Sequence, residues 1–157
     1  MRKHLPHILI ISFVFILAPT AQVASHAGEI EDAREAVRKN PDDAEAHYNL
    51  GIAYGESSKW KEEIEAYKQA IKIDPDYRDA HYNLGYSYCE SGKYREAIKS
   101  YKQAIRIDPD CSSAHFGLGL AYHLSNDRDS ALEQYKILKK LDTELANELF
   151  SLIGEYQ

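Results

Sequence analysis

Three histidines recur at intervals of 34 residues, at His47, His81 and His115, and imidazole nitrogens are common metal ligands. A shared metal would need these nitrogens to converge, since each metal–nitrogen bond is about 2 Å and two ligand atoms therefore lie within about 4 Å of each other. Equivalent residues of successive helical units are separated by at least one helix-packing distance, about 8–10 Å. We therefore expect the three rings to pack between helices, and we expect no metal site and no cofactor.

The two cysteines, Cys89 and Cys111, raise the question of a disulfide or a reactive thiol. Cys89 falls late in one expected helix and Cys111 just before a later one. If those helices run side by side in the same sense, the thiols lie near opposite ends. A disulfide requires Cα atoms within about 7 Å, so we predict two free thiols. A redox role for Cys89 in an enzyme accessory is the least favoured interpretation, because no orienting residues surround it.

No other catalytic pattern is present in the sequence. It contains no phosphate-binding loop, no paired catalytic carboxylates and no Gly-x-Ser-x-Gly elbow. The net charge of −6 and the lack of a basic stripe argue against a nucleic-acid partner. We therefore expect neither an enzyme nor a small-molecule substrate, and we look for the function on the protein surface.

An internal repeat positions these residues. Residues 44–76 and 78–110 align without a gap, with 21 of 33 positions identical, and the period of 34 residues continues downstream. A fixed period of this length indicates an array in which each unit buries its apolar face against its neighbours. We expect repeats at 44–77, 78–111 and 112–145, a half repeat before them at 29–41 and a capping helix after them at 144–157.

Apolar residues recur at helical spacing in both halves of each repeat. In the first repeat, Asp42 and Asp43 are suited to cap a helix from Ala44 to Glu56, and Trp60 opens a second helix. Each first helix also contains an internal glycine, which costs about 1 kcal/mol relative to alanine. We expect a close approach of the neighbouring helix at these positions, which are Gly51, Gly85 and Gly119.

The N-terminus differs from the rest of the chain. Arg2 and Lys3 precede an apolar run, and Ser25-His26-Ala27 provides the small residues that a signal peptidase recognises. We predict a signal peptide at residues 1–27 and an exported domain, periplasmic or secreted, at residues 28–157. The alternative is an uncleaved anchor at residues 8–24, about 17 residues long, with the domain facing the periplasm.

A family resemblance follows from the repeated residues. The pattern His47-x2-Leu50-Gly51-x2-Tyr54, followed by Tyr67, Ala70 and Pro75, resembles the tetratricopeptide repeat, and the second repeat matches it with Ala97, Tyr101, Ala104 and Pro109. The resemblance implies an all-α fold, a right-handed α-solenoid of three helix-turn-helix repeats with N- and C-terminal capping helices. This chain departs from the family pattern with histidine at the first motif position, Glu63 at a small-residue position, and Leu138 and Thr143 in the third repeat.

The resemblance also implies a function. The first helices of such repeats line the concave side of a superhelix, and partner proteins bind there. We therefore expect a non-enzymatic adaptor that binds a segment of another protein in this groove. Carried over by position, the groove residues are Tyr48, Asn49, Ile52, Glu56, Asp79, Tyr82, Asn83, Tyr86, Glu90, Phe116, Leu120 and His123.

The residue types in this groove narrow the class of partner segment that we expect to bind. Relatives that hold the C-terminal carboxylate of chaperones use lysine and arginine in the groove, whereas this chain places tyrosine, asparagine, isoleucine and acidic residues there. We therefore do not expect an acidic C-terminal peptide to bind. The alternative function is a structural scaffold that self-associates through the ends of the array or through its convex face.

Overall fold

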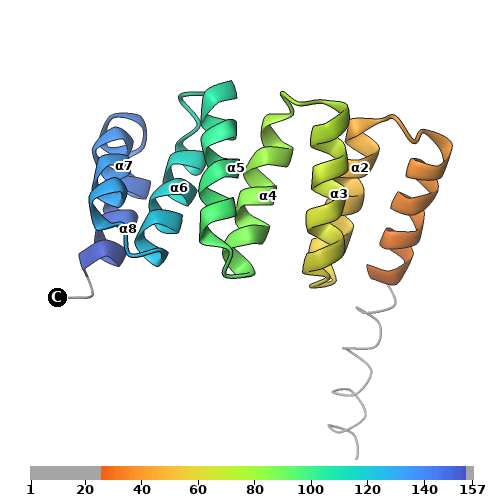
Figure 1. Ribbon diagram of the computed structural model, residues 1–157, viewed down its shortest axis with the longest axis horizontal. Helices are drawn as coiled ribbons and strands as arrows, with labels where there is room; N and C mark the ends of the chain where they lie inside the picture. Colours follow the sequence, from red (N-terminus) through yellow and green to blue (C-terminus); the bar gives the residue numbers. More distant parts are fainter. Residues whose placement is uncertain (1–25, 155–157) are drawn as a thin grey trace, which may run out of the picture.

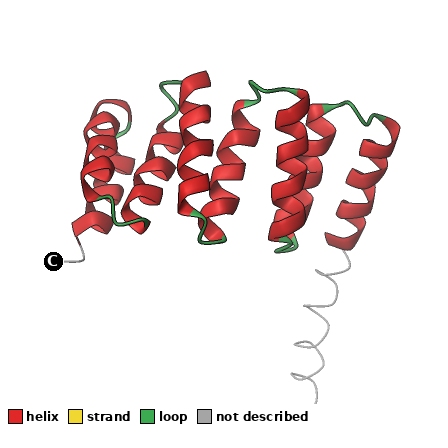
Figure 2. Cartoon of the chain, in the orientation of Figure 1, coloured by secondary structure: helices red, strands yellow, loops and turns green. Residues whose placement is uncertain are grey.

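The computed structural model describes residues 26–154, where all the regular structure is helical (Figure 2). Successive helices pack against each other and form an elongated array (Figure 1). Residues 26–39 form the first of them. The others are α2 (Ala44–Glu56), α3 (Trp60–Ile73), α4 (Arg78–Glu90), α5 (Tyr94–Ile107), α6 (Ser112–Leu124), α7 (Arg128–Leu141) and α8 (Thr143–Gly154).

The predicted all-α repeat architecture is confirmed. The pairs α2–α3, α4–α5 and α6–α7 fall on the three expected repeats, and α2 has the expected bounds. The first helix already includes residues 26–28, ahead of the expected start at residue 29. The predicted signal peptide lies outside the described residues except for its last two, and the alternative anchor lies wholly outside them. The last three residues of the expected capping helix are also outside the described range. Between residues 26 and 154, no helix has both the length and the apolar character needed to cross a membrane.

Aspartates and left-handed residues define the helix ends. Asp43 Oδ1 accepts a hydrogen bond of 3.0 Å from the backbone N–H of Glu45, and Asp142 Oδ1 accepts from the N–H groups of the first turn of α8. These bonds satisfy donors that have no partner inside a helix. The turn within each repeat contains one residue with positive φ at the same repeat position: Ser58 (54°), Gly92 (69°) and Asn126 (63°).

Replacing Ser58 by glycine is expected to raise the free energy of unfolding by about 0.5–1 kcal/mol, because a Cβ atom strains a left-handed backbone that glycine adopts freely. Urea unfolding would measure the change. The matched control is Ser57→Gly, since Ser57 has a φ of −95° and gains nothing from glycine. A similar stabilisation by both substitutions would contradict the strain at Ser58.

The glycines inside the first helices make room for aromatic rings. A Cβ atom at Gly51 would collide with the ring of Tyr67 from α3, and one at Gly85 would lie 2.9 Å from ring carbons of Tyr101 from α5. Both tyrosines are buried. The expected close approach is therefore confirmed at these two positions, where a ring of the second helix approaches, and also at Gly119, where the side chain of Leu149 from α8 approaches.

Each repeat histidine forms a hydrogen bond to the loop that precedes its helix. The Nε2–H groups of His47, His81 and His115 donate to the carbonyl oxygens of Pro41, Pro75 and Pro109 at 2.9, 2.9 and 3.0 Å. Two of the rings are buried and that of His47 is half-buried. We had expected rings that only pack between helices; instead, each ring also binds a carbonyl, so it holds its first helix to the preceding loop.

Candidate functional site

The first helices of the repeats carry the expected groove residues. On the side of the array that these first helices form, α4 contacts α6 and α6 contacts α8. Each first helix also contacts the second helix of its own repeat. Three groove residues occupy the same position of successive repeats, and we call them the inner strip: Ile52, Tyr86 and Leu120. The exposed fraction is 36% for Ile52 and 49% for Tyr86, and Leu120 is half-buried. The inner strip is therefore an accessible apolar surface that runs across three helices.

A second row of groove residues is aromatic and more deeply packed. Tyr48 lies with its ring centroid 5.7 Å from that of Tyr67 and 5.0 Å from that of Tyr77, and Tyr82 lies 5.8 Å from Tyr101. Burial raises the pKa of both Tyr48 and Tyr82, so their hydroxyls stay neutral at physiological pH. These two rings mainly join helices to one another, as aromatic pairs do in protein cores.

The same row of aromatic residues continues into α6 and α8. Phe116 and Phe150 follow Tyr82 at intervals of 34 residues. Phe116 is half-buried, whereas Phe150 is 51% exposed and contacts Tyr135 with a centroid distance of 4.9 Å. Phe150 was not among the predicted groove residues, although the period alone places it in this row. It is the most exposed ring of the row.

Asn83 is already engaged within the protein. Its Nδ2 donates a hydrogen bond of 3.0 Å to the hydroxyl of Tyr48, so that the second repeat holds the first. From the sequence, Asn83 was predicted to line the groove that binds a partner. Asn49 is exposed at the equivalent position of the first repeat, and Gly117 takes that position in the third. Of the two predicted amides, Asn49 is therefore the more accessible.

Carboxylates border the inner strip. Glu56 and Glu90 are exposed at the C-terminal ends of α2 and α4, and Leu124 occupies the equivalent position in α6 with 41% of its surface exposed. Near the other end of α4, Asp79 lies 2.8 Å from the guanidinium of Arg78. The surface around the strip is therefore acidic over the first two repeats and apolar at the third.

His123 follows Leu120 by three residues on α6 and lies at the third-repeat end of the inner strip. It lines a pocket of about 360 Å³ at the end of α6, together with Leu124, Asn126, Arg128 and Ile153. The structure therefore separates the predicted groove residues into three groups. These are the accessible strip with its carboxylates, the packed aromatic row with Asn83, and His123 in its own pocket.

Both cysteines are free, as predicted. Burial raises the pKa of the Cys89 thiol to about 11, so that it is protonated at neutral pH and is a poor nucleophile. Cys111 Sγ lies 3.5 Å from Nη1 of Arg78. The redox interpretation of Cys89 therefore loses its chemical basis.

Glu63 is a buried carboxyl group at a position where the other repeats have alanine. Its side chain is 4% exposed, and its Oε2 has no hydrogen-bond partner. Burial raises the pKa of Glu63, and the negative charge of Glu90 adds to this rise. A Cβ atom at Gly55 would lie 2.9 Å from Glu63 Oε1, so glycine at that position leaves room for the carboxyl group.

Comparisons with known proteins agree with the repeat pattern. Family models described as "TPR repeat" and "Tetratricopeptide repeat" match residues 53–90 and 85–126, and residues 33–65, respectively. The crystal structure of MamA has 31% sequence identity and a TM-score of 0.67, over 81% of this chain and 70% of MamA. The TPR domain of Arabidopsis OM64 has 17% identity and a TM-score of 0.68, over 73% of this chain and 96% of the domain. No curated protein matches the sequence.

Proposed function

Because this chain belongs to the tetratricopeptide repeat family, whose fold generally mediates protein–protein interaction, we propose that it is a non-enzymatic adaptor. Its groove binds a segment of a partner protein along the inner strip. The observation that carries this proposal is the exposure of Ile52 and Tyr86 at the same position of adjacent repeats. Accessible rings and branched side chains are typical anchors of protein interfaces.

The charge beside the inner strip defines the partner further. Glu56 and Glu90 give the groove a negative border, so a partner segment with apolar side chains and lysine or arginine is complementary. An acidic segment would bring like charges together. We also propose that the domain is exported, because the N-terminal sequence has the features of a signal peptide.

Selection from a library of short random peptides would test this function. We expect enrichment of apolar residues together with lysine or arginine, and depletion of aspartate and glutamate. Tyr86→Ala should then weaken the selected peptides by about tenfold or more while the helical content stays unchanged, because an exposed ring contributes to contact but little to packing. Isothermal titration calorimetry would measure the loss.

The matched control is Ile137→Ala on α7, a residue 37% exposed that lies outside the groove, compared with Ile52→Ala at 36%. Only the Ile52 variant should lose affinity. Equal affinity of both variants and of Tyr86→Ala would refute binding along the inner strip. Asn83→Ala is a poor probe, because it also removes the hydrogen bond to Tyr48.

The repeat positions of the two terminal helices favour self-association as a second candidate function. Residues 26–39 precede α3 by one period, so they occupy a second-helix position, and α8 overlaps the first-helix position of a fourth repeat. Two chains stacked end to end would complete a repeat in a contact that can propagate. The exposed side chains of Glu144 and Glu148 on α8 oppose such stacking.

Light scattering over a range of concentrations separates the two candidates. An adaptor runs as a monomer at every concentration. A mass that grows with concentration, and that falls after Leu152→Glu on α8, would favour the scaffold instead.

A further inference from the structure

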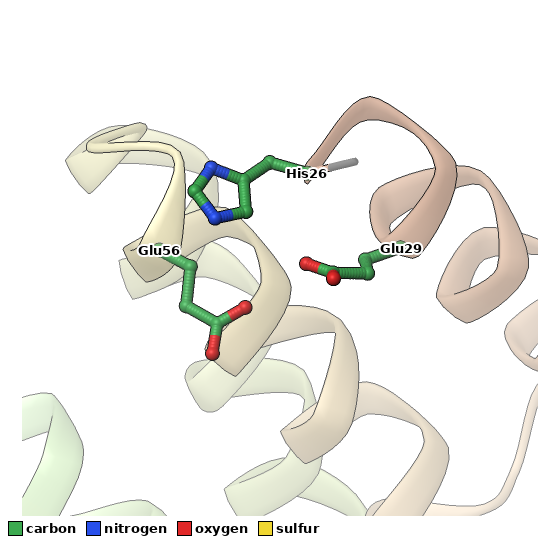
Figure 3. Close-up of side chains that lie close together, drawn as sticks. All are labelled: His26, Glu29 and Glu56. Carbon is green, nitrogen blue, oxygen red and sulfur yellow. The ribbon is translucent and has the colours of Figure 1, made fainter. Parts of the chain in front are cut away.

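We propose that His26, Glu29 and Glu56 form a binding site for a divalent transition-metal ion, with Zn²⁺ as the best fit. His26 and Glu29 belong to the first helix, and Glu56 is the last residue of α2. One ligand atom from each residue can be chosen so that all three lie within 4.8 Å of one another. Figure 3 shows the imidazole and the two carboxylates around a common space between the two helices.

The backbone brings these groups together. His26 and Glu29 are three residues apart on one helix, a spacing that places both side chains on the same face. Glu56 reaches them from the C-terminal end of α2, where the helix dipole also favours a cation. A pocket of about 300 Å³ lined by His26, Glu56 and Lys59 leaves room for water to complete the coordination shell.

The charges and distances suit a metal. A cation placed between the carboxylates of Glu29 and Glu56 would attract both. Within residues 26–154, Glu56 has no lysine or arginine within ion-pair distance, although Lys59 lines the same pocket. Tetrahedral zinc with bonds of about 2.0–2.1 Å requires ligand atoms about 3.3 Å apart. Both glutamates are exposed and His26 is half-buried, so small side-chain rotations can close the remaining gap.

The ligand types select the class of ion. Imidazole with two carboxylates is suited to Zn²⁺ and similar transition metals, whereas Mg²⁺ and Ca²⁺ prefer shells made only of oxygen ligands. The site is small, open and incomplete, so the expected affinity is micromolar. The bound ion would join the first helix to α2, which are otherwise held by the packing of Ile30 and by a hydrogen bond of 3.1 Å from Arg34 Nε to the Tyr54 hydroxyl.

The site also bears on the predicted processing of the chain. Cleavage after Ala27 would remove His26 and leave only the two carboxylates. A chain processed in this way would lose the site, whereas an anchored chain would keep it. The metal site is therefore a property of the full chain, and it shares Glu56 with the acidic border of the inner strip.

Calorimetric titration of the full-length chain with Zn²⁺ would test the site, after mass spectrometry has verified that residues 1–27 are present. We expect one ion per chain with a micromolar Kd, unaffected by millimolar Mg²⁺. His26→Ala and Glu56→Gln should each weaken binding by about tenfold or more. The matched control, Glu148→Gln, removes an exposed carboxylate on α8 and should bind Zn²⁺ as the parent chain does.

Two further readouts separate this site from adventitious binding. Zn²⁺ should slow amide exchange at residues 26–30 and 55–59, and acidification should release the ion because a protonated imidazole cannot bind metal. The proposal is overturned if no binding tighter than millimolar is seen. It is also overturned if His26→Ala and Glu56→Gln both retain the parent affinity.

Discussion

Gly117→Ala is expected to lower the free energy of unfolding by about 2–3 kcal/mol, even though alanine is the better helix former by about 1 kcal/mol. A Cβ atom at Gly117 would lie 2.5 Å from Cζ of Tyr101 and 2.9 Å from its hydroxyl oxygen. The ring has little room to move, because Gly85 on α4 also lies close to it, with a Cβ position 2.9 Å from Cδ1 and Cε1 of Tyr101. Tyr101 is 3% exposed, so both glycines serve one buried ring that joins three helices. Urea unfolding followed by circular dichroism would measure the loss.

The same substitution at Gly28 provides the control for Gly117→Ala. No atom lies within 4 Å of a Cβ at Gly28, so Gly28→Ala should leave stability unchanged or raise it slightly. Combining Gly117→Ala with Tyr101→Leu should recover part of the loss, since the shorter side chain removes the collision. If Gly117→Ala is as stable as the parent chain, Tyr101 is not confined as the structure indicates.

The sequence predicted the helices well because local signals and the repeat agree. Asp43 caps α2 as the sequence suggested, and residues with positive φ recur at one repeat position, as in Ser58 and Gly92. These features depend on residues a few positions apart, and the period then carries them through the chain.

The site was harder to predict because it depends on distant pairs. The hydrogen bond from Asn83 to Tyr48 spans 35 residues, and it changes Asn83 from a free amide into an inter-repeat contact. His26 and Glu56 are also far apart in sequence. The prediction that the chain has no metal site rested on the three histidines that share a repeat position, and His26 is not one of them. Periodicity shows which residues are equivalent, but it does not show which side chains meet across repeats. Only Phe150 could have been added from the period alone.

Glu63 shows how the first repeat differs from the other two at one shared repeat position. Its counterparts, Ala97 and Ala131, are fully buried and apolar. The first repeat accommodates the larger carboxyl group through Gly55, whereas the hydroxyl of Ser87 in the second repeat donates its hydrogen bond to the carbonyl oxygen of Asn83. The space for the side chain is therefore provided, but the hydrogen bonds of a buried carboxylate are incomplete, since Oε2 has no partner. Such a group is expected to destabilise the fold when it is charged.

Glu63→Gln is therefore expected to stabilise the protein at pH 8, by about 1–3 kcal/mol, and to have little effect near pH 4. Burial raises the pKa of Glu63 in the folded state, so the unfolded chain loses its proton first as the pH rises above about 4.3. The parent protein thus loses stability through this residue between that pH and the raised folded pKa, and the loss is constant above it. Glutamine keeps the shape and cannot ionise, so its advantage should grow over the same range.

Urea unfolding of both proteins from pH 4 to pH 8 would measure this difference, with Glu62→Gln as the exposed neighbour that should show no such trend. A constant difference across the range would mean that Glu63 ionises equally easily in the folded and unfolded states. A growing difference would establish that the α2–α3–α4 contact contains a carboxyl group that prefers to be neutral. Since Glu63 lies away from the inner strip, the gain in stability should leave peptide affinity unchanged, which separates the role of this residue in folding from any role in recognition.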